Sequence, residues 1–271
     1  MKARAFAPGN ASCIFRICSD KNPRKMGSLG VGFTVNKGVT AEVQLSKKTI
    51  IRFNKKKISI PTVTTVLNKL TDKNVSVDFS SGLPLGMGFG LSGACALTTA
   101  LAVDKLLNLK KPKKELYMIA HTAEVINRTG LGDVAGQING GFLVKRTKGS
   151  PLKAERLNVK EKAVYYKLFW KLDTKKVITD RKIKGRINKA GDNALKKIRK
   201  SISLSEIIEI SKIFAEESGL LRNKKVKQAI RDIEKNSGKA SMIMLGHAVF
   251  SSIPFKGCKR LRITQNKARL L

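Results

Sequence analysis

The chain has 271 residues, a length that suits one large domain or two small ones. Hydrophobic residues make up 42% of it and charged residues 27%, which excludes a wholly disordered protein. The 55 Lys and Arg outnumber the 19 Asp and Glu, so the formal net charge is +36 and the chain attracts anions: nucleic acid, a membrane surface or a small phosphate compound. Aromatic residues are only 6%, which leaves few side chains for stacking on nucleic-acid bases.

The cysteine and histidine content argues against a structural zinc site. The cysteines are scattered, none of them forms a CxxC pair, and only two histidines are present. Scattered cysteines in a chain of this length are typical of reduced, buried thiols in a cytosolic protein. The cysteines are Cys13, Cys18, Cys95 and Cys258, and the histidines are His121 and His247.

The sequence predicts neither a signal peptide nor a membrane-spanning helix. Lys2 and Arg4 precede an apolar run, but the Pro-Gly-Asn of residues 8–10 interrupts it. The longest apolar stretch, residues 91–107, contains an Asp and a Lys and is therefore unsuited to a membrane. We expect a cytoplasmic protein without membrane contact.

Residues 1–80 are predicted to alternate short strands with turns, because β-rich runs are separated by turn-forming residues. A short first strand should end at the Ala-Pro-Gly-Asn of residues 7–10. Residues 61–70 (PTVTTVLNKL) instead have the apolar spacing of a helix. The other predicted strands are residues 30–34, 39–45, 49–53 and 75–79.

The next segment is predicted to be mostly helical. A loop at residues 80–90 (SSGLPLGMGFG) precedes a helix of small residues over 91–107. A second helix, over 114–127, has its apolar side chains on one face. A basic linker at 110–114 precedes this second helix, the Gly-Leu-Gly of 130–132 ends it, and a strand follows at 142–146.

The turn residues Gly149, Ser150 and Pro151 separate two differently composed halves and predict a domain boundary. The predicted domains are residues 1–150 and 151–271. Strands and helices mix without a regular βαβ rhythm, so the predicted fold class is α+β. In the second half we expect a strand at 164–172, a basic segment at 182–200, helices at 204–218 and 224–236, and an apolar segment at 242–253.

The strongest local motif is PLGMGFGLSGA at residues 84–94. Glycines at alternate positions lead into a helix, so backbone N–H groups can turn toward a ligand and the helix N-terminus adds a partial positive charge. These features predict a phosphate-binding loop, with the Ser92 hydroxyl within reach of a phosphate-bound metal. For a glycine cluster alone, a tight turn with close helix packing would be the preferred explanation. A Walker A loop is excluded because no Lys follows Gly90, and a dinucleotide-binding GxGxxG is disfavoured because the preceding strand ends near Phe79.

A second group of polar residues lies in HTAEVINRTGLGD, residues 121–133. His121 and Glu124 are three positions apart on one predicted helix and share a face, and the glycine turn can fold Asp133 back toward Glu124. Mg²⁺ prefers one or two carboxylates with phosphate oxygens, a hydroxyl and water, so Glu124 with Ser92 would suit a metal and leave Asp133 as a base. Taken alone, each acidic residue is better explained by capping or salt bridging, and His121 by packing in a helix.

The motifs, in this order, resemble those of the GHMP kinases, which include the galacto-, homoserine, mevalonate and phosphomevalonate kinases. Within this superfamily they are similar to those of the archaeal pantoate kinases. The resemblance is strong over the first 150 residues and weaker beyond them. Each of the first two motifs, taken on its own, would indicate only a turn. The motifs are FAPG at residues 6–9, GSLGVG at 27–32, GFGLSGA at 88–94 and HTAEVINRTGLGD at 121–133, with Gly140-Gly141 downstream.

The resemblance implies an N-terminal domain like domain 2 of ribosomal protein S5 and a ferredoxin-like C-terminal domain, with ATP between them. It implies that ATP phosphorylates pantoate to 4-phosphopantoate in archaeal-type coenzyme A biosynthesis. Asp133 would take the proton of the attacking hydroxyl, and Ser92 and Glu124 would hold Mg²⁺. The residues implied to bind the ATP phosphates are Pro84, Gly86, Gly88, Gly90, Leu91, Ser92, Gly93 and Ala94.

The resemblance also implies residues that lie near pantoate. Ser28, His121 and Thr179 belong to this set. Either Lys145 or Arg146 would face the pantoate carboxylate, because a register error of one residue exchanges the two sides of a strand.

Two positions depart from the pattern of the superfamily. Asn10 stands where several members have Lys, which removes one cation from the phosphate side. Leu91 and Gly93 flank Ser92 where many relatives have Ser and Ala, so the metal-binding hydroxyl remains but its neighbour does not.

Two other functions remain compatible with the sequence. A GHMP kinase acting on homoserine, mevalonate or shikimate would keep the chemistry and change the acceptor. An RNA- or ribosome-associated protein is suggested by the net charge and by the basic segment at 182–200, although RRM-like aromatics, a KH loop and a zinc knuckle are missing from the sequence. Nucleic acid is therefore an open but not a favoured partner, and a homodimer is also left open.

Overall fold

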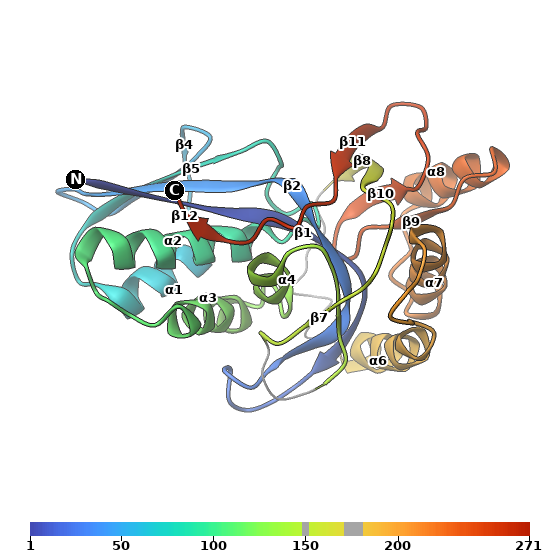
Figure 1. The fold of residues 1–271 in the computed structure, drawn as a ribbon, viewed down its shortest axis with the longest axis horizontal. Coiled ribbons are helices and arrows are strands. Elements are labelled where there is room, and N and C mark those ends of the chain that lie inside the picture. Colours follow the sequence, from blue (N-terminus) through green and yellow to red (C-terminus); the bar gives the residue numbers. More distant parts are fainter. Residues whose placement is uncertain (148–151, 171–180) are drawn as a thin grey trace.

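The computed structural model describes residues 1–147, 152–170 and 181–271, whose strands form two β-sheets (Figure 1). The larger sheet has the order β12 (Arg269–Leu270), β1 (Lys2–Cys18), β2 (Gly27–Leu45), β5 (Val75–Ser81), β3 (Ile50–Phe53) and β4 (Lys56–Lys57). In this sheet β6 (Phe142–Lys145) also pairs with β2, and β7 (Glu155–Arg156) pairs with β6. The smaller sheet has the order β11 (Lys259–Arg262), β8 (Ala163–Trp170), β10 (His247–Ser251) and β9 (Ala240–Met242).

Two groups of helices accompany the two sheets, so the predicted α+β class is confirmed. The first group lies along the larger sheet; in the second, α7 and α8 lie beside the smaller sheet, and α6 packs on β1 and α7 (Figure 1). In the described ranges the structure contains no helix that is long and apolar enough to cross a membrane. The first group consists of α1 (Pro61–Leu70), α2 (Leu91–Leu107), α3 (Lys113–Asn127) and α4 (Asp133–Asn139), and the second of α6 (Arg181–Lys196), α7 (Leu204–Glu217) and α8 (Lys224–Lys235).

Strands β1 and β2 are longer than the sequence predicts. The expected end of the first strand at residues 7–10 and the expected break between 34 and 39 are both wrong, because each strand runs on without interruption. The register between the two strands shifts at Pro8/Gly9 and again between Ser12 and Ile14. Such bulges accommodate a proline within a strand and use the same residue types as turns, which explains the error.

Glycines allow the C-terminal part of β1 and the N-terminal part of β2 to approach each other closely. The GSLGVG segment, which would be only a turn in isolation, begins β2. A Cβ atom on Gly30 would lie 2.2 Å from the Ile14 carbonyl oxygen, and one on Gly32 would lie 2.8 Å from that of Ala11. Only glycine fits at these positions, and their missing side chains leave room for a cavity along β2.

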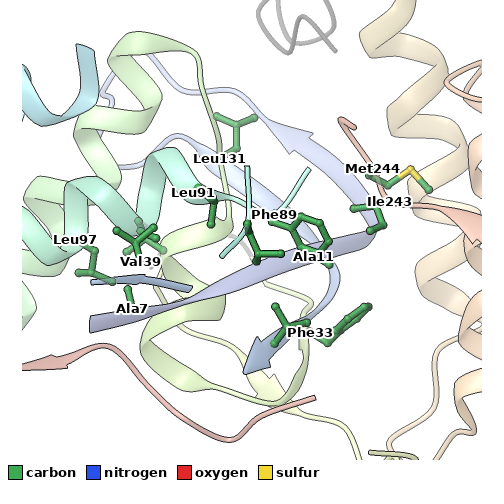
Figure 2. Packing of buried hydrophobic residues seen from close by; sticks show 14 of the residues in the cluster. Ala7, Ala11, Phe33, Val39, Phe89, Leu91, Leu97, Leu131, Ile243 and Met244 are labelled. Carbon is green, nitrogen blue, oxygen red and sulfur yellow. The ribbon is translucent and has the colours of Figure 1, made fainter. Parts of the chain in front are cut away.

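Helix α2 lies at the centre of the hydrophobic core. Its small residues are buried on almost every side, so that it packs against β1, β2, α1 and α3 at once. Figure 2 shows Leu97 of this helix near Val39 of β2, and Phe89 near Ile243 of the segment between β9 and β10. The core is therefore continuous from the larger sheet to the smaller one.

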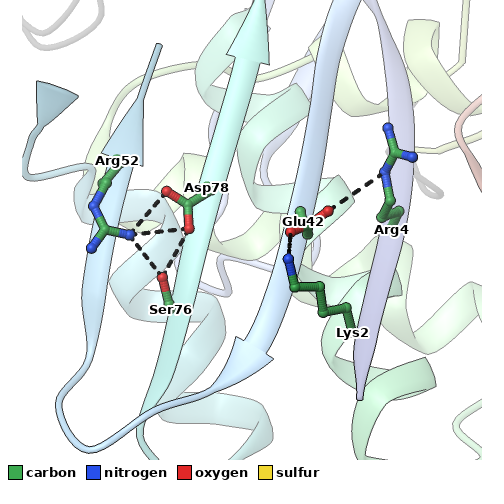
Figure 3. A network of polar contacts seen from close by, with 6 residues as sticks. All are labelled: Lys2, Arg4, Glu42, Arg52, Ser76 and Asp78. Atoms are coloured by element: carbon green, nitrogen blue, oxygen red, sulfur yellow. Dashed lines mark hydrogen bonds and ion pairs between the residues drawn. The ribbon is translucent and has the colours of Figure 1, made fainter. Parts of the chain in front are cut away.

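The outer face of the larger sheet is polar, because successive residues of a strand point to opposite faces. Lys2 and Arg4 of β1 form ion pairs with Glu42 of β2, at 2.6 and 3.9 Å. Arg52 of β3 pairs with Asp78 of β5 at 3.0 Å (Figure 3). Exposed pairs of this kind contribute about 0–1 kcal/mol each, so they mark the solvent face and do not hold the sheet together.

The second half contains the predicted helices and strand where the structure describes it. Helix α7 begins with a capping box between Ser203 and Glu206, and the Asn223 side chain caps α8. The basic segment at 182–200 is largely helix α6, and the strand predicted at 164–172 is β8 up to residue 170. Thr179 and the predicted domain boundary at residues 149–151 lie outside the described residues.

The C-terminal segment connects the two sheets. After β11 in the smaller sheet, the chain returns to the larger sheet, where Leu270 of β12 pairs with Ala5 of β1. On the way, the Thr264 carbonyl accepts a hydrogen bond from the Gly141 N–H, and the Ala268 N–H donates to the Gln137 carbonyl. The segment therefore lies along α4 and the turn that follows it.

Candidate active site

The glycine loop before α2 has the backbone conformation that its sequence predicts. Gly86, Gly88 and Gly90 all have positive φ, at 76°, 87° and 57°, which an L side chain adopts with difficulty. The loop also packs closely on the turn between β9 and β10, since a Cβ on Gly246 would lie 2.5 Å from the Met87 carbonyl oxygen. The two halves of the chain thus meet at this loop.

Glu124 and Asp133 lie together beside the first turn of α2. Glu124 comes from the last turn of α3 and Asp133 is the first residue of α4. The Ser92 hydroxyl donates a hydrogen bond to Glu124 Oε1 at 2.9 Å. The predicted fold-back of Asp133 is confirmed, because a Cβ on Gly130 would lie 2.6 Å from Glu124 Oε1 and 2.7 Å from Asp133 Oδ2.

Two further glycines make room for these carboxylates. A Cβ on Gly93 would lie 2.6 Å from Glu124 Oε2, and a Cβ on Gly90 would lie 2.6 Å from Asp133 Oδ1. With Gly130, they form a glycine-lined space that fits the two acidic side chains and no additional carbon atom. The glycines of the two motifs therefore bring two carboxylates together inside a basic protein.

Burial raises the pKa of both carboxyl groups. For Glu124, which is fully buried, burial raises the pKa well above its usual range and the charge of Asp133 raises it further, while the Ser92 hydrogen bond opposes the change. For Asp133, burial raises the pKa to about 6 and the hydrogen bond from Asn10 opposes it. Asp133 is then mostly ionised at neutral pH and able to accept a proton.

Glu124 and Ser92 fit the requirements of a Mg²⁺ site. Glu124 Oε2 is buried and accepts no hydrogen bond from the described residues, which is costly unless a cation occupies the position. A hydroxyl and a carboxylate are hard oxygen ligands, and Mg²⁺ commonly takes its remaining ligands from phosphate and water. No cluster of three or more His, Cys, Asp or Glu that could hold a metal ion occurs in the described residues.

A cleft of about 370 Å³ opens over the glycine loop. Ser92 and Asp133 line this glycine-loop cleft, together with Met244 and Leu245 of the turn between β9 and β10. Arg128, which caps the end of α3 with a φ of 55°, brings a positive charge to the opening. The remaining lining residues are Ser12, Leu85, Gly86, Gly88, Gly90, Leu91, Asn127 and Thr129.

A second cavity lies between β1, β2, α4 and β6. Ser28 and Lys145 line this Lys145 cavity together with Asn10, whose amide donates to Asp133 Oδ1 at 2.9 Å. Ser12 lines both this cavity and the glycine-loop cleft. Burial lowers the pKa of Lys145 to about 8, so its ammonium group keeps its charge at neutral pH and suits an anionic ligand.

Two of the residues implied to bind the substrate do not line this cavity. Arg146 donates hydrogen bonds to the Leu195 and Ile198 carbonyls at 3.3 and 2.6 Å, so of the two alternatives only Lys145 lines the cavity. The His121 ring Nε2 hydrogen-bonds the Met26 carbonyl at 2.9 Å, and burial lowers the pKa of the ring to about 4. His121 is therefore a neutral, packed side chain beside the cavity, which agrees with the packing alternative.

The residues implied to bind phosphate divide into two sets. Gly86, Gly88, Gly90, Leu91 and Ser92 line the glycine-loop cleft. The others do not: Pro84 is exposed, Gly93 packs on Glu124, and the Ala94 N–H donates to the Gly90 carbonyl.

Sequence reasoning missed several residues of the site. Asn10 appears in the sequence only as a departure from a lysine, yet its amide contacts Asp133. The Gln137 side chain donates to the Gly90 carbonyl at 2.8 Å and so connects α4 to the glycine loop. Arg128 lies inside the HTAEVINRTGLGD motif and could have been found there as its one cation, whereas no local signal distinguishes Met244 or Leu245.

Comparison with known proteins identifies the family to which the chain belongs. The family model of the GHMP kinases N terminal domain matches residues 56–141. A pantoate kinase of Methanocaldococcus jannaschii is 36% identical over 252 residues, covering 90% of this chain and 90% of that protein. A pantoate kinase of Thermococcus kodakarensis is 30% identical over 268 residues, covering 93% and 88%.

Solved structures show the same fold. A protein described as a phosphotransferase related to the CoA biosynthesis pathway matches with a TM-score of 0.85 and 25% identity, covering 100% of this chain and 99% of that one. Mevalonate diphosphate decarboxylase from Staphylococcus aureus matches with a TM-score of 0.72 and 13% identity, covering 100% and 98%. The chain therefore belongs to the GHMP kinases and, within that superfamily, to the family of the archaeal pantoate kinases.

Proposed function

We propose that this protein transfers the γ-phosphoryl group of ATP to the primary hydroxyl of pantoate, forming 4-phosphopantoate and ADP. The observation that carries the proposal is that Asp133 lines the glycine-loop cleft and accepts a hydrogen bond from Asn10, which lines the Lys145 cavity. A kinase needs a phosphate site and a hydroxyl site on either side of one base. The pantoate kinases among its relatives supply the identity of the acceptor.

The glycine loop is proposed to bind the triphosphate. Its backbone N–H groups and the N-terminus of α2 favour negative charge, and Arg128 adds a full positive charge at the opening of the cleft. Met244 and Leu245 also line the cleft and reduce the access of water. Transfer of a phosphoryl group depends mostly on such positioning and charge neutralisation.

Asp133 is proposed to orient and deprotonate the attacking hydroxyl. Its raised pKa of about 6 places it close to the working pH, where a general base is effective. In the Lys145 cavity, the ammonium group of Lys145 would pair with the pantoate carboxylate and the Ser28 hydroxyl would donate a hydrogen bond to the substrate. These contacts would direct the primary hydroxyl toward Asp133.

Ser92 and Glu124 are proposed to hold Mg²⁺, which would neutralise charge on the phosphate oxygens. Cation binding would also keep Glu124 ionised, because it opposes the effect of burial on this carboxyl. The division into a ribosomal protein S5 domain 2-like domain and a ferredoxin-like domain, and the cytoplasmic location, belong to the same proposal and are supported by the family.

The test is ADP release by the purified protein with Mg·ATP and one acceptor at a time. Pantoate, homoserine, mevalonate and shikimate are compared with a reaction that lacks an acceptor, and phosphorus NMR identifies the product. We expect turnover with pantoate alone, and Asp133→Asn protein serves as the control for contaminating kinases. Turnover only with another acceptor would overturn the pantoate assignment. Folded protein that binds ATP but turns over no acceptor would overturn the kinase proposal and direct attention to RNA binding.

A further inference from the structure

The carboxylate of Asp133 is held by a single hydrogen bond among the described residues. Asn10 donates this bond from Nδ2 to Oδ1 at 2.9 Å, and Asp133 Oδ2 accepts none from the described side chains. A carboxylate that abstracts a proton from a bound hydroxyl has to present one oxygen in a fixed direction. The group that fixes this direction is therefore part of the machinery of the reaction.

Asn10 is itself held rigidly. It is 4% exposed, it pairs with Thr34 across the ladder between β1 and β2, and its N–H donates to the Phe89 carbonyl at 2.9 Å. The bulge at Pro8/Gly9 immediately before it sets its register. Its side chain therefore projects from an anchored strand and reaches α4 from outside that helix.

The direction of the Asn10 amide follows from its neighbours. An ionised carboxylate only accepts hydrogen bonds, so the amide NH₂ group has to face Asp133. The amide oxygen then faces α4, where a Cβ on Gly136 would lie 2.0 Å from it. Gly136 thus leaves space for the amide of Asn10, and the two residues fit each other.

We propose that Asn10 is a positioning residue, whose amide binds Oδ1 of Asp133 so that Oδ2 receives the proton of the attacking hydroxyl. The inference rests on the proposed role of Asp133 as the base. Asp133 lines the glycine-loop cleft, and its Oδ2 accepts no hydrogen bond from the described side chains. A neutral amide orients the carboxylate without adding the charge that a lysine would bring.

The test uses Asn10→Leu, which keeps the approximate size of the side chain and removes the donor. We expect kcat to fall about 10²-fold, with KM for ATP changed less than about threefold, because Asn10 acts on the base and does not line the glycine-loop cleft. Asn10→Lys restores a donor, and its kcat is expected to be at least about tenfold higher than that of Asn10→Leu. The matched control is Asn188→Leu, which removes an amide that bonds the Ile17 backbone of the same strand, far from Asp133. Its kcat should stay within about twofold of the wild-type value.

A crystal structure of Asn10→Leu provides a readout that does not depend on turnover. We expect the Asp133 carboxylate to rotate away from its wild-type orientation. An unchanged orientation, an unchanged kcat, or equal losses in Asn10→Leu and Asn188→Leu would each overturn the inference. If the wild type phosphorylates an acceptor other than pantoate, the pantoate assignment fails while the comparison of the Asn10 variants is made with that acceptor.

Discussion

The glycine-loop cleft and the Lys145 cavity are built in different ways. Much of the glycine-loop cleft comes from one continuous stretch, residues 85–92, whereas the Lys145 cavity takes its lining from β1, β2, α4 and β6. Phosphate can be bound by backbone N–H groups, which a single loop and helix N-terminus supply. A shaped organic acceptor needs side chains from several elements. The phosphate side is therefore encoded locally, and the acceptor side depends on the whole fold.

The largest expected effect comes from removing the base that both sides share. Asp133→Asn should lower kcat by about 10³-fold, because the amide cannot accept the hydroxyl proton. Mg·ATP affinity, measured by calorimetry, should change less than about threefold, since the glycine loop remains intact. Near-wild-type turnover in this variant would contradict the assignment of the base.

A single methyl group should disrupt the space between the two carboxylates. Gly130→Ala would place a Cβ 2.6 Å from Glu124 Oε1 and 2.7 Å from Asp133 Oδ2, so that both side chains have to move. We expect kcat to fall about 10²-fold in a protein whose circular dichroism is unchanged. The matched control is Gly185→Ala in α6, where nothing lies within 4 Å of the added Cβ. Its activity should be unchanged and its free energy of unfolding higher by about 0.5–1 kcal/mol. Equal activity of the two alanine variants would contradict this account.

The acceptor side can be separated from the phosphate side at two adjacent residues. Lys145→Met should raise KM for pantoate about 30-fold and leave KM for ATP nearly unchanged, because only the pairing with the substrate carboxylate is lost. Arg146→Met should change KM for pantoate less than about threefold and lower the melting temperature, since Arg146 bonds the Leu195 and Ile198 carbonyls. The reverse pattern in steady-state kinetics would show that Arg146, and not Lys145, binds the pantoate carboxylate.

The smallest expected effect is a higher melting temperature when Glu124, a proposed Mg²⁺ ligand, is replaced by Gln. Burial raises the pKa of Glu124 in the folded protein, so the unfolded chain releases this proton more readily. The stability contributed by the protonated group is present at pH 4 and is lost as pH rises toward neutrality. Without Mg²⁺, Glu124→Gln should therefore raise the melting temperature by about 2 °C or more at pH 7 and hardly at all at pH 4. Scanning calorimetry at the two pH values measures this difference. A lower melting temperature at pH 7 would contradict the sign.

Sequence reasoning found what is encoded over short distances. The helices around the two motifs, the glycine loop and the approach of Asp133 to Glu124 all follow from local spacing and turn chemistry. It failed where residues with the chemistry of a turn lie inside a strand, as at residues 7–10 and between residues 34 and 39. In both places the partner strand supplies the hydrogen bonds, and a partner distant in the sequence leaves no local signal.

The acceptor side shows the same limit at single residues. Whether Lys145 or Arg146 faces the cavity depends on the register of β6 against β2, which pairs Lys145 with Gly30. The role of Asn10 depends on the contact between β1 and α4, which joins positions 10 and 133. Neither fact is present in the spacing of residues around the site.

The return of the C-terminal segment to β1 sets the order in which the site can form during synthesis. The Ala268 N–H donates a hydrogen bond to the Gln137 carbonyl, and the Gln137 side chain donates one to the Gly90 carbonyl of the glycine loop. Leu270 pairs with Ala5 near the beginning of β1. A ribosome releases these two ends of the sheet far apart in time, since the chain is made at about 5–20 residues per second. The edge of β1 and the back of α4 therefore stay uncovered until residues 268–270 have left the exit tunnel.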